Sequence, residues 1–109
     1  MPIDRSLLSG STPMLILALL RDGDKYGYEM VSELARRSDE TFLLKEGTLY
    51  PLLHALEQEG LVQCYTKAAP NGRTRKYYRL TDAGRGRLEE KTAQWREFSA
   101  GVNAVLNMA

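Results

Sequence analysis

The sequence has few of the residues from which metal and catalytic sites are commonly built. Its 109 residues include one cysteine and one histidine, which excludes an internal disulfide and a cysteine-cluster zinc site. It also has no glycine-rich phosphate loop and no nucleophile motif. We therefore expect no metal, no cofactor and no enzymatic activity. We expect Cys64 to be a small structural residue of the core or the sheet, with redox sensing as the alternative.

Long hydrophobic runs are absent as well. The longest, Met14–Leu20, has seven residues, whereas a membrane-spanning helix needs about 20. No small-residue cleavage pattern follows it, so we expect neither an export signal nor a membrane anchor. Together with the single thiol, this favours a cytoplasmic protein.

A large excess of charge of one sign is also lacking, because the formal net charge is +1. The segment Thr66–Arg79 departs from this balance, since it holds five cations and no acid. The five are Lys67, Arg73, Arg75, Lys76 and Arg79. Such clustering is typical of surfaces that bind nucleic-acid phosphates. An ordinary solvated loop is the simpler alternative.

Two helices are predicted before residue 40. Thr12-Pro13 has the form of a helix cap followed by proline, and it predicts a helix over Met14–Leu20 that is apolar on nearly all sides. Tyr26–Arg37 has the spacing of an amphipathic helix, with Gly27 indicating tight packing at its start. Ser38–Leu44 is interpreted as a short extended connector.

A third helix is predicted to begin between Glu46 and Leu49. Pro51 favours the later start, because proline is tolerated in a first turn but disrupts an interior one, and Thr48 would then be the cap. One stripe of this helix carries Leu49, Leu52, Leu53 and Leu56, and the other side carries Thr48, His54, Ala55 and Gln58. We expect the leucine face to pack in the core and the second face to be free to contact another molecule.

Two strands follow, over Leu61–Lys67 and Arg75–Leu80, with the turn signal Asn71-Gly72 between them. Because successive strand residues point to opposite faces, Tyr77 and Tyr78 must separate. We expect Tyr78 to face the core and Tyr77 to lie at the surface of the hairpin among its cations.

A long helix is predicted from about Ala83 to about Leu106, with Thr81-Asp82 as its cap. Leu88, Trp95, Val102 and Ala109 recur every seven residues along it, and Phe98 and Val105 complete the stripe. A repeat of seven favours packing against a partner helix. The predicted organisation is therefore a domain over 1–81 and a dimerisation helix over 82–109.

Three segments together resemble the PadR family of winged-helix transcriptional regulators. Tyr26–Met30 resembles the family's glycine-tyrosine-glutamate segment, Gly47–Leu53 its Gly-x-Leu-Tyr-Pro-x-Leu core, and Gly72–Thr81 its Gly-Arg-x-Arg-Lys-Tyr-Tyr-x-Leu-Thr wing. The order and spacing of all three agree with the family. The resemblance implies a mainly α fold with a small β-hairpin, namely a winged helix-turn-helix followed by a long dimerisation helix.

The same resemblance implies a homodimer on a two-fold DNA operator, with the third helix in the major groove and the wing on the backbone or minor groove. The predicted DNA-binding residues are Lys45, Thr48, Tyr50, His54, Lys67, Arg73, Arg75, Lys76 and Tyr77. Lys45 departs from the serine of many members. The third helix carries three glutamates and neither lysine nor arginine from Glu46 to Glu59.

The shortness of the C-terminal part resembles the compact members that dimerise through one helix. In some of these a tryptophan stacks on flat apolar compounds between the subunits, and Trp95 has a similar place. The expected ligand-binding residues are Leu8, Ser11, Met14, Leu15, Trp95 and Phe98. The expected dimer interface is Leu7, Leu88, Trp95, Phe98, Val102 and Val105. Simple dimer packing is the alternative for Trp95.

These observations together predict a dimeric, sequence-specific DNA-binding regulator. By resemblance it is a repressor, released by a small apolar or aromatic ligand at the dimer interface. Its partners would be double-stranded DNA, a second copy of the chain and that ligand, with no membrane. The alternative is a protein-interaction module that uses a winged helix without specific DNA readout, and the acidic third helix is what favours it.

Overall fold

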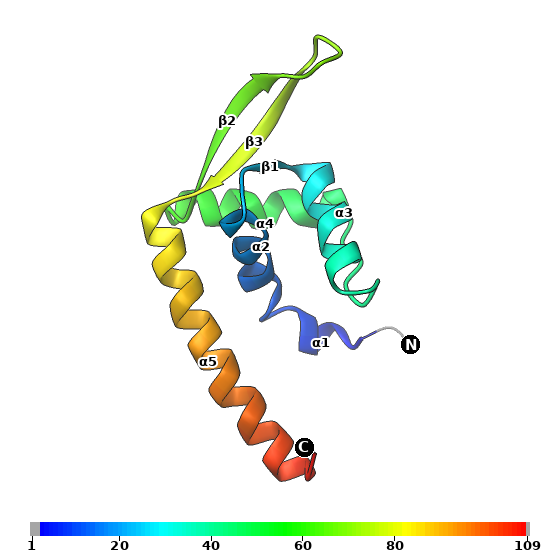
Figure 1. Ribbon diagram of the computed structural model, residues 1–109, viewed down its shortest axis with the longest axis vertical. Coiled ribbons are helices and arrows are strands. Elements are labelled where there is room, and N and C mark those ends of the chain that lie inside the picture. The colour runs from blue at the N-terminus through cyan, green and yellow to red at the C-terminus, as the bar shows by residue number, and fades with distance from the viewer. Residues whose placement is uncertain (1–2, 109) are drawn as a thin grey trace.

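The computed structural model describes residues 3–108, which form five helices and a three-stranded antiparallel sheet. In chain order they are α1 (Arg5–Leu8), α2 (Thr12–Arg21), β1 (Lys25–Tyr26), α3 (Gly27–Arg37), α4 (Glu46–Gln58), β2 (Val62–Ala68), β3 (Thr74–Leu80) and α5 (Asp82–Leu106). Helices α2, α3 and α4 gather on one side of the β2–β3 hairpin, and α5 extends away from them (Figure 1). This is the predicted winged helix-turn-helix with a long C-terminal helix.

The core forms where α2 meets α3, α4 and the base of the hairpin. Its fully buried side chains are Ile16, Leu17, Leu20, Met30, Leu49 and Leu53. Helix α2 also buries Leu19, as expected for a helix that is apolar on most sides. The leucine stripe of α4 lies in this core, with Leu56 buried and Leu52 partly covered. The periodicity of the sequence predicted these faces correctly.

Helix α4 begins earlier than Pro51 suggested. Lys45 is its N-cap, and the N–H groups of Thr48 and Leu49 both donate to the Lys45 carbonyl, at 3.0 and 2.9 Å. Thr48 therefore lies in the first turn and is not the cap, and Pro51 lies inside the helix. Proline cannot donate to the carbonyl four residues earlier, which belongs to Gly47. Because Gly47 is exposed, water can hydrogen-bond that carbonyl, and the helix tolerates the proline.

Two short elements were not predicted from the sequence. Helix α1 is one turn long, and the Asp4 carboxylate accepts from the Ser6 N–H at its start. Strand β1 has two residues, with Lys25 opposite Tyr78 and Tyr26 opposite Tyr77. Neither is long enough to show a period. The predicted starts of two helices also move by one residue, because Ser11 and not Thr12 is the N-cap of α2, and Tyr26 caps α3.

The tip of the hairpin is a three-residue turn. Ala69 and Arg73 face each other, with the Ala69 N–H donating to the Arg73 carbonyl at 2.6 Å, and Gly72 N–H donates back to the Ala69 carbonyl at 2.9 Å. Gly72 has φ +84°, a value that glycine adopts without the strain of a Cβ atom. Pro70, Asn71 and Gly72 therefore make the turn that the Asn-Gly pair indicated.

Helix α5 begins against the base of the hairpin and then leaves the body. The Thr81 side chain accepts from the Gly84 N–H at 3.0 Å and donates to the Gly60 carbonyl at 2.7 Å. Leu88, one turn further, is 3% exposed and belongs to the core of its own chain. Its assignment to the dimer interface was therefore wrong, because a leucine enclosed by α2 and the hairpin has no surface left for a partner. Ala109 lies outside the described residues.

Beyond Leu88 the apolar residues of α5 are uncovered. Trp95, Phe98, Val102, Val105 and Leu106 are all exposed in the single chain. Within residues 3–108, no helix has both the length and the apolar character that crossing a bilayer requires.

Candidate nucleic-acid interface

The strand register determines on which face of the hairpin each cation lies. Gln63, Tyr65 and Lys67 on β2 stand opposite Arg79, Tyr77 and Arg75 on β3. Alternation along each strand places these six side chains on one face. The opposite face carries Val62, Tyr78 and Leu80, all of which are buried. Three of the five wing cations therefore share the outer face of the sheet, and the inward direction predicted for Tyr78 is confirmed.

Three tyrosines form the centre of this outer face. The rings of Tyr65 and Tyr77 are stacked with centroids 5.7 Å apart, and Tyr26 from β1 meets Tyr77 edge-on at 5.5 Å. The Tyr65 hydroxyl donates to the Asp24 carboxylate at 2.6 Å, and this bond to a negative group raises the pKa of Tyr65. The rings and the bond connect the hairpin to the segment before α3. The wing is thus held by the body about halfway along its strands.

Two cations lie over these rings. The Lys67 ammonium is 5.5 Å from the centre of the Tyr77 ring, and the Arg75 guanidinium carbon is 4.4 Å from that of Tyr26. Both distances are within the range of cation–π attraction. Lys67 and Arg75 also stand directly opposite each other in the ladder, where like charges destabilise a sheet by a few tenths of a kcal/mol to about 1 kcal/mol. The tyrosines offset part of that repulsion and hold both charges at the surface.

The five cations of the wing have no acid within ion-pair distance among residues 3–108. In the part of the chain that the structure describes, none of the ion pairs involves Lys67, Arg73, Arg75, Lys76 or Arg79. Arg79 is bonded to the neutral amide of Gln63, and Arg73 and Lys76 are exposed. The wing therefore presents uncompensated positive charge, which suits a polyanion with regularly spaced phosphates.

The solvent side of α4 supplies the second part of the surface. Lys45, Thr48 and His54 are exposed, and the Gln58 amide nitrogen lies 3.2 Å from His54 Nε2. Lys45 is at the N-terminal end of the helix, where the helix dipole also favours a phosphate. These three residues remain accessible to DNA, as their predicted role requires.

Tyr50 is positioned differently from the other predicted contacts of α4. A Cβ atom built on Gly27 would lie 2.4 Å from Tyr50 Oη and 2.9 Å from Tyr50 Cζ. The end of the ring therefore rests on the backbone of Gly27, at the start of α3. This contact explains the glycine at that position, and it gives Tyr50 a part in joining α4 to α3.

The outer face also contains two residues that the sequence analysis did not assign to the site, Tyr26 and Tyr65. Tyr65 could have been found, because it alternates with Lys67 along the predicted strand. Tyr26 could not, since only the pairing of β1 with β3 brings it to Tyr77.

The expected ligand residues are not brought together by the hollows described for the single chain. Met14 and Leu15 pack against the core. Trp95 and Phe98 lie near each other, with ring centroids 6.0 Å apart. One shallow apolar hollow of α5 is lined by Glu97, Phe98, Gly101, Val102, Val105 and Leu106, and it includes only Phe98 of the expected set.

The fold, the charged wing and α4 agree with a comparison against protein families. The model of the PadR-like family of transcriptional regulators matches residues 16–90, from the middle of α2 to the first turns of α5. The chain belongs to the PadR-like family. It is accordingly a DNA-binding transcriptional regulator with a winged-helix fold, and the relatives described below are regulators rather than enzymes.

Several relatives of this PadR-like regulator have been identified. It is 36% identical over 87 residues to a transcriptional regulator of Mycobacterium tuberculosis, covering 80% of this chain and 78% of that one. It is 32% identical over 75 residues to the negative transcriptional regulator PadR of Bacillus subtilis, covering 69% of this chain and 41% of the longer relative.

Solved structures agree over nearly the whole chain. A transcriptional regulator from Clostridium thermocellum superposes with a TM-score of 0.85 at 31% identity, covering 94% of this chain and 96% of the other. A PadR family regulator from Eggerthella lenta gives a TM-score of 0.82 at 36% identity, covering 95% and 88%. The long α5 is thus part of the shared architecture.

Proposed function

We propose that this PadR-like regulator is a homodimeric, sequence-specific repressor. The observation that carries the proposal is the outer face of the hairpin, where Lys67, Arg75 and Arg79 form none of the ion pairs of residues 3–108. Lys67 and Arg75 lie over rings of the tyrosine cluster. Charge held in this way can meet a phosphate backbone without losing much side-chain freedom on binding. Lys45, Thr48 and His54 on α4 would then face the major groove, and the two wings the flanking backbone.

The second half of α5 supports the dimer. Phe98 and Val105 are 63% and 86% exposed in the single chain, and apolar residues at this spacing on a long helix are ordinarily covered by another helix. Residues 82–109 would thus serve as the dimerisation helix and residues 1–81 as the DNA-binding domain. Two chains related by a two-fold axis would present two copies of α4 to a two-fold operator.

The proposal that this protein represses transcription is supported by the name of one relative, the negative transcriptional regulator of Bacillus subtilis. For release from DNA, we propose a small apolar or aromatic ligand beside Trp95 and Phe98. Leu8, Ser11, Met14 and Leu15, from either chain of the dimer, would complete the cavity. A rise or quench of Trp95 fluorescence with planar hydrophobic cations would support this, and a flat response across the panel would count against it.

The proposal is tested by fluorescence anisotropy of the protein on labelled DNA from its own upstream region, against scrambled DNA, at low and near-physiological salt. We expect the upstream DNA to bind more tightly, and both affinities to fall as salt rises. Changing Lys67, one of the three cations of the outer face, to glutamine removes one wing cation from each subunit. If both cations contact phosphate, the slope of log affinity against log salt falls by about 1.8.

Equal and weak binding of both DNAs would contradict the proposal and favour a protein-docking module. Arg36→Gln is the matched control, because Arg36 is an exposed cation of α3 paired with Glu33. It should leave the salt slope unchanged.

A further inference from the structure

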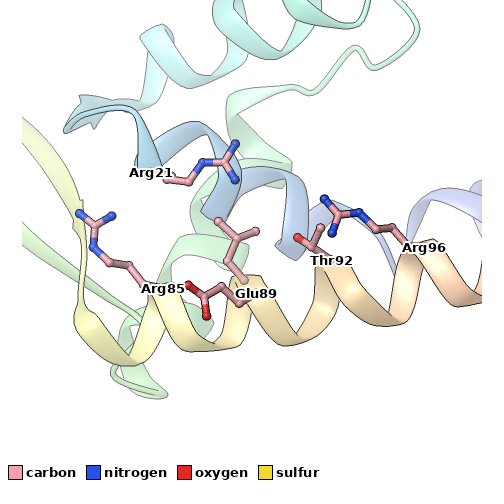
Figure 2. A pocket seen from close by; sticks show the side chains of 6 residues that line it. Arg21, Arg85, Glu89, Thr92 and Arg96 are labelled. Atoms are coloured by element: carbon pink, nitrogen blue, oxygen red, sulfur yellow. The ribbon is translucent and has the colours of Figure 1, made fainter.

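A hollow lined by three arginines lies between the end of α2 and the first half of α5. Its volume is about 290 Å³, and its lining residues are Arg21, Arg85, Leu88, Glu89, Thr92 and Arg96. Arg21 reaches toward α5 from α2, and the guanidinium of Arg96 is turned back toward Thr92 (Figure 2). Arg85 stands at the other end of the row, beside Glu89. The hollow shares no residue with the expected Trp95 cavity or with the wing.

Ion pairs among residues 3–108 leave most of the positive charge of this hollow unbalanced. Among the ion pairs of residues 3–108, Arg85 and Arg96 take part in none, and Arg21 has a single contact of 3.8 Å to its neighbour Asp22. Asp22 is already engaged by Arg37 at 2.7 Å. Glu89 is the one acid of the lining. Three cations and one anion leave a local charge of +2.

We propose that this hollow binds a small organic dianion, such as a dicarboxylate or a phosphate monoester. Guanidinium groups bind carboxylates and phosphates through two parallel N–H bonds. Arg21 and Arg96 come from different helices, so they can bind the two carboxylates of a dicarboxylate or different oxygens of one phosphate. The Thr92 hydroxyl can donate to the same ligand. A volume near 290 Å³ lies at the lower end of the usual range for ligand pockets, which selects for a small molecule.

The position of Arg21 gives such a ligand a route to the wing. Arg21 is the last residue of α2, and the next three residues, Asp22-Gly23-Asp24, lead to β1. Asp24 accepts the hydrogen bond from Tyr65 of the wing. A bound anion that draws Arg21 from Asp22 therefore acts at the loop to which the hairpin is tied. This step rests on the proposed DNA-binding function, whereas anion binding itself does not.

Isothermal titration calorimetry of the full-length protein, at constant ionic strength and without DNA, tests the site. The probes are succinate, glycerol phosphate, inorganic phosphate and, as the monoanion, acetate. We expect one succinate or glycerol phosphate per chain, with acetate at least about tenfold weaker because it leaves one arginine unpaired. Binding of inorganic phosphate alone would point to a simple ion site and would overturn the organic-ligand assignment.

Three variants locate the binding. Arg96→Gln should weaken it about tenfold to a hundredfold, the value of one charged hydrogen-bonded pair. Glu89→Gln should tighten it, because it removes the competing carboxylate. Arg36→Gln, a change to an exposed arginine of α3 outside the hollow, should have no effect.

The proposal is overturned if no dianion binds either the natural protein or Glu89→Gln, or if Arg36→Gln weakens binding as much as Arg96→Gln does. It is also overturned if Arg96→Gln shifts the oligomeric state with no anion bound, because a partner chain's carboxylates would then occupy the hollow. Anisotropy on the operator, repeated with and without the bound dianion, tests the route to the wing. A failure of DNA binding there contradicts the proposed function and leaves the calorimetric result standing.

Discussion

Replacing either of two glycines in the first turns of α5 with alanine should have opposite effects on stability, because only one of the two positions lacks space for a Cβ atom. A Cβ atom on Gly84 would lie 2.1 Å from the Leu61 carbonyl oxygen and 2.6 Å from Leu80 Cδ1. On Gly86, two residues further along the same helix, a Cβ atom meets nothing within 4 Å. Gly84→Ala and Gly86→Ala are therefore a matched pair.

The magnitudes follow from helix propensity and from overlap. Alanine is favoured over glycine in a helix by about 1 kcal/mol, so Gly86→Ala should stabilise the protein by about that amount. Gly84→Ala has the same intrinsic gain but must displace a backbone carbonyl, since Leu61 and Leu80 are both buried. Overpacking of this kind costs about 3 kcal/mol at the upper end of its usual range. The net effect is a loss of about 2 kcal/mol, and the two variants should differ by about 3 kcal/mol.

Urea unfolding followed by circular dichroism at one fixed protein concentration measures the difference. The dependence of the unfolding free energy on urea should be unchanged, so the shift in midpoint reports stability directly. The reasoning is refuted if Gly84→Ala is as stable as Gly86→Ala. That result would mean that α5 does not dock on the Leu61 carbonyl in solution.

Four further predictions each concern a single side chain. Burial raises the pKa of Tyr78 to about 12. The stability that Tyr78 contributes is therefore complete below its ordinary pKa of 10.0 and is lost as pH rises toward 12. In Tyr78→Phe, the free energy of unfolding should fall less steeply over that pH range. Hydrogen bonds from two arginines of the same helix lower the pKa of Glu33 from 4.5 to about 2. The stability that Glu33 contributes is therefore lost as pH falls through that interval. In Glu33→Gln, the free energy of unfolding should fall less steeply with pH over the same interval. Leu88→Ala should cost about 2–5 kcal/mol of unfolding free energy, because it leaves a cavity in the core. Val105→Ala should leave the single chain's packing unchanged but weaken the dimer in sedimentation, and equal effects of the two variants on unfolding at low concentration would contradict their different places.

Much of the fold was predictable because the elements that build it carry their own signal. The leucines of α4 and the apolar run of α2 repeat at the spacing of a buried helix face, and Asn71-Gly72 between two strand patterns marks a hairpin. An error arose at the start of α4, where the rule that proline disrupts a helix interior did not account for solvation of the backbone. Pro51 argued for a late start to α4, but the exposed Gly47 carbonyl can be satisfied by water, and the helix begins at Glu46.

The candidate site was predictable in its charge and less so in its geometry. Five cations without an acid can be counted in the sequence, and the motifs of Gly47–Leu53 and Gly72–Thr81 indicated a family that the comparison with family models confirmed. The fixed arrangement of those cations depends on Tyr26 and Asp24, which reach the hairpin through contacts with β3 and Tyr65. Tyr26 and Tyr77 are distant in sequence, and no spacing predicts their meeting.

The sequence by itself determined which longer stretches form helices and strands, which face of each is apolar and where positive charge is concentrated. Those properties depend on neighbours within a few residues, and local periodicity records them. The tertiary structure decided that Leu88 belongs to the core rather than to a partner, that Gly84 lies against the Leu61 carbonyl, and that Arg21 joins Arg85 and Arg96 around one hollow. Each of these depends on how α5 is oriented against α2 and the hairpin, which is set by packing between segments far apart in the chain.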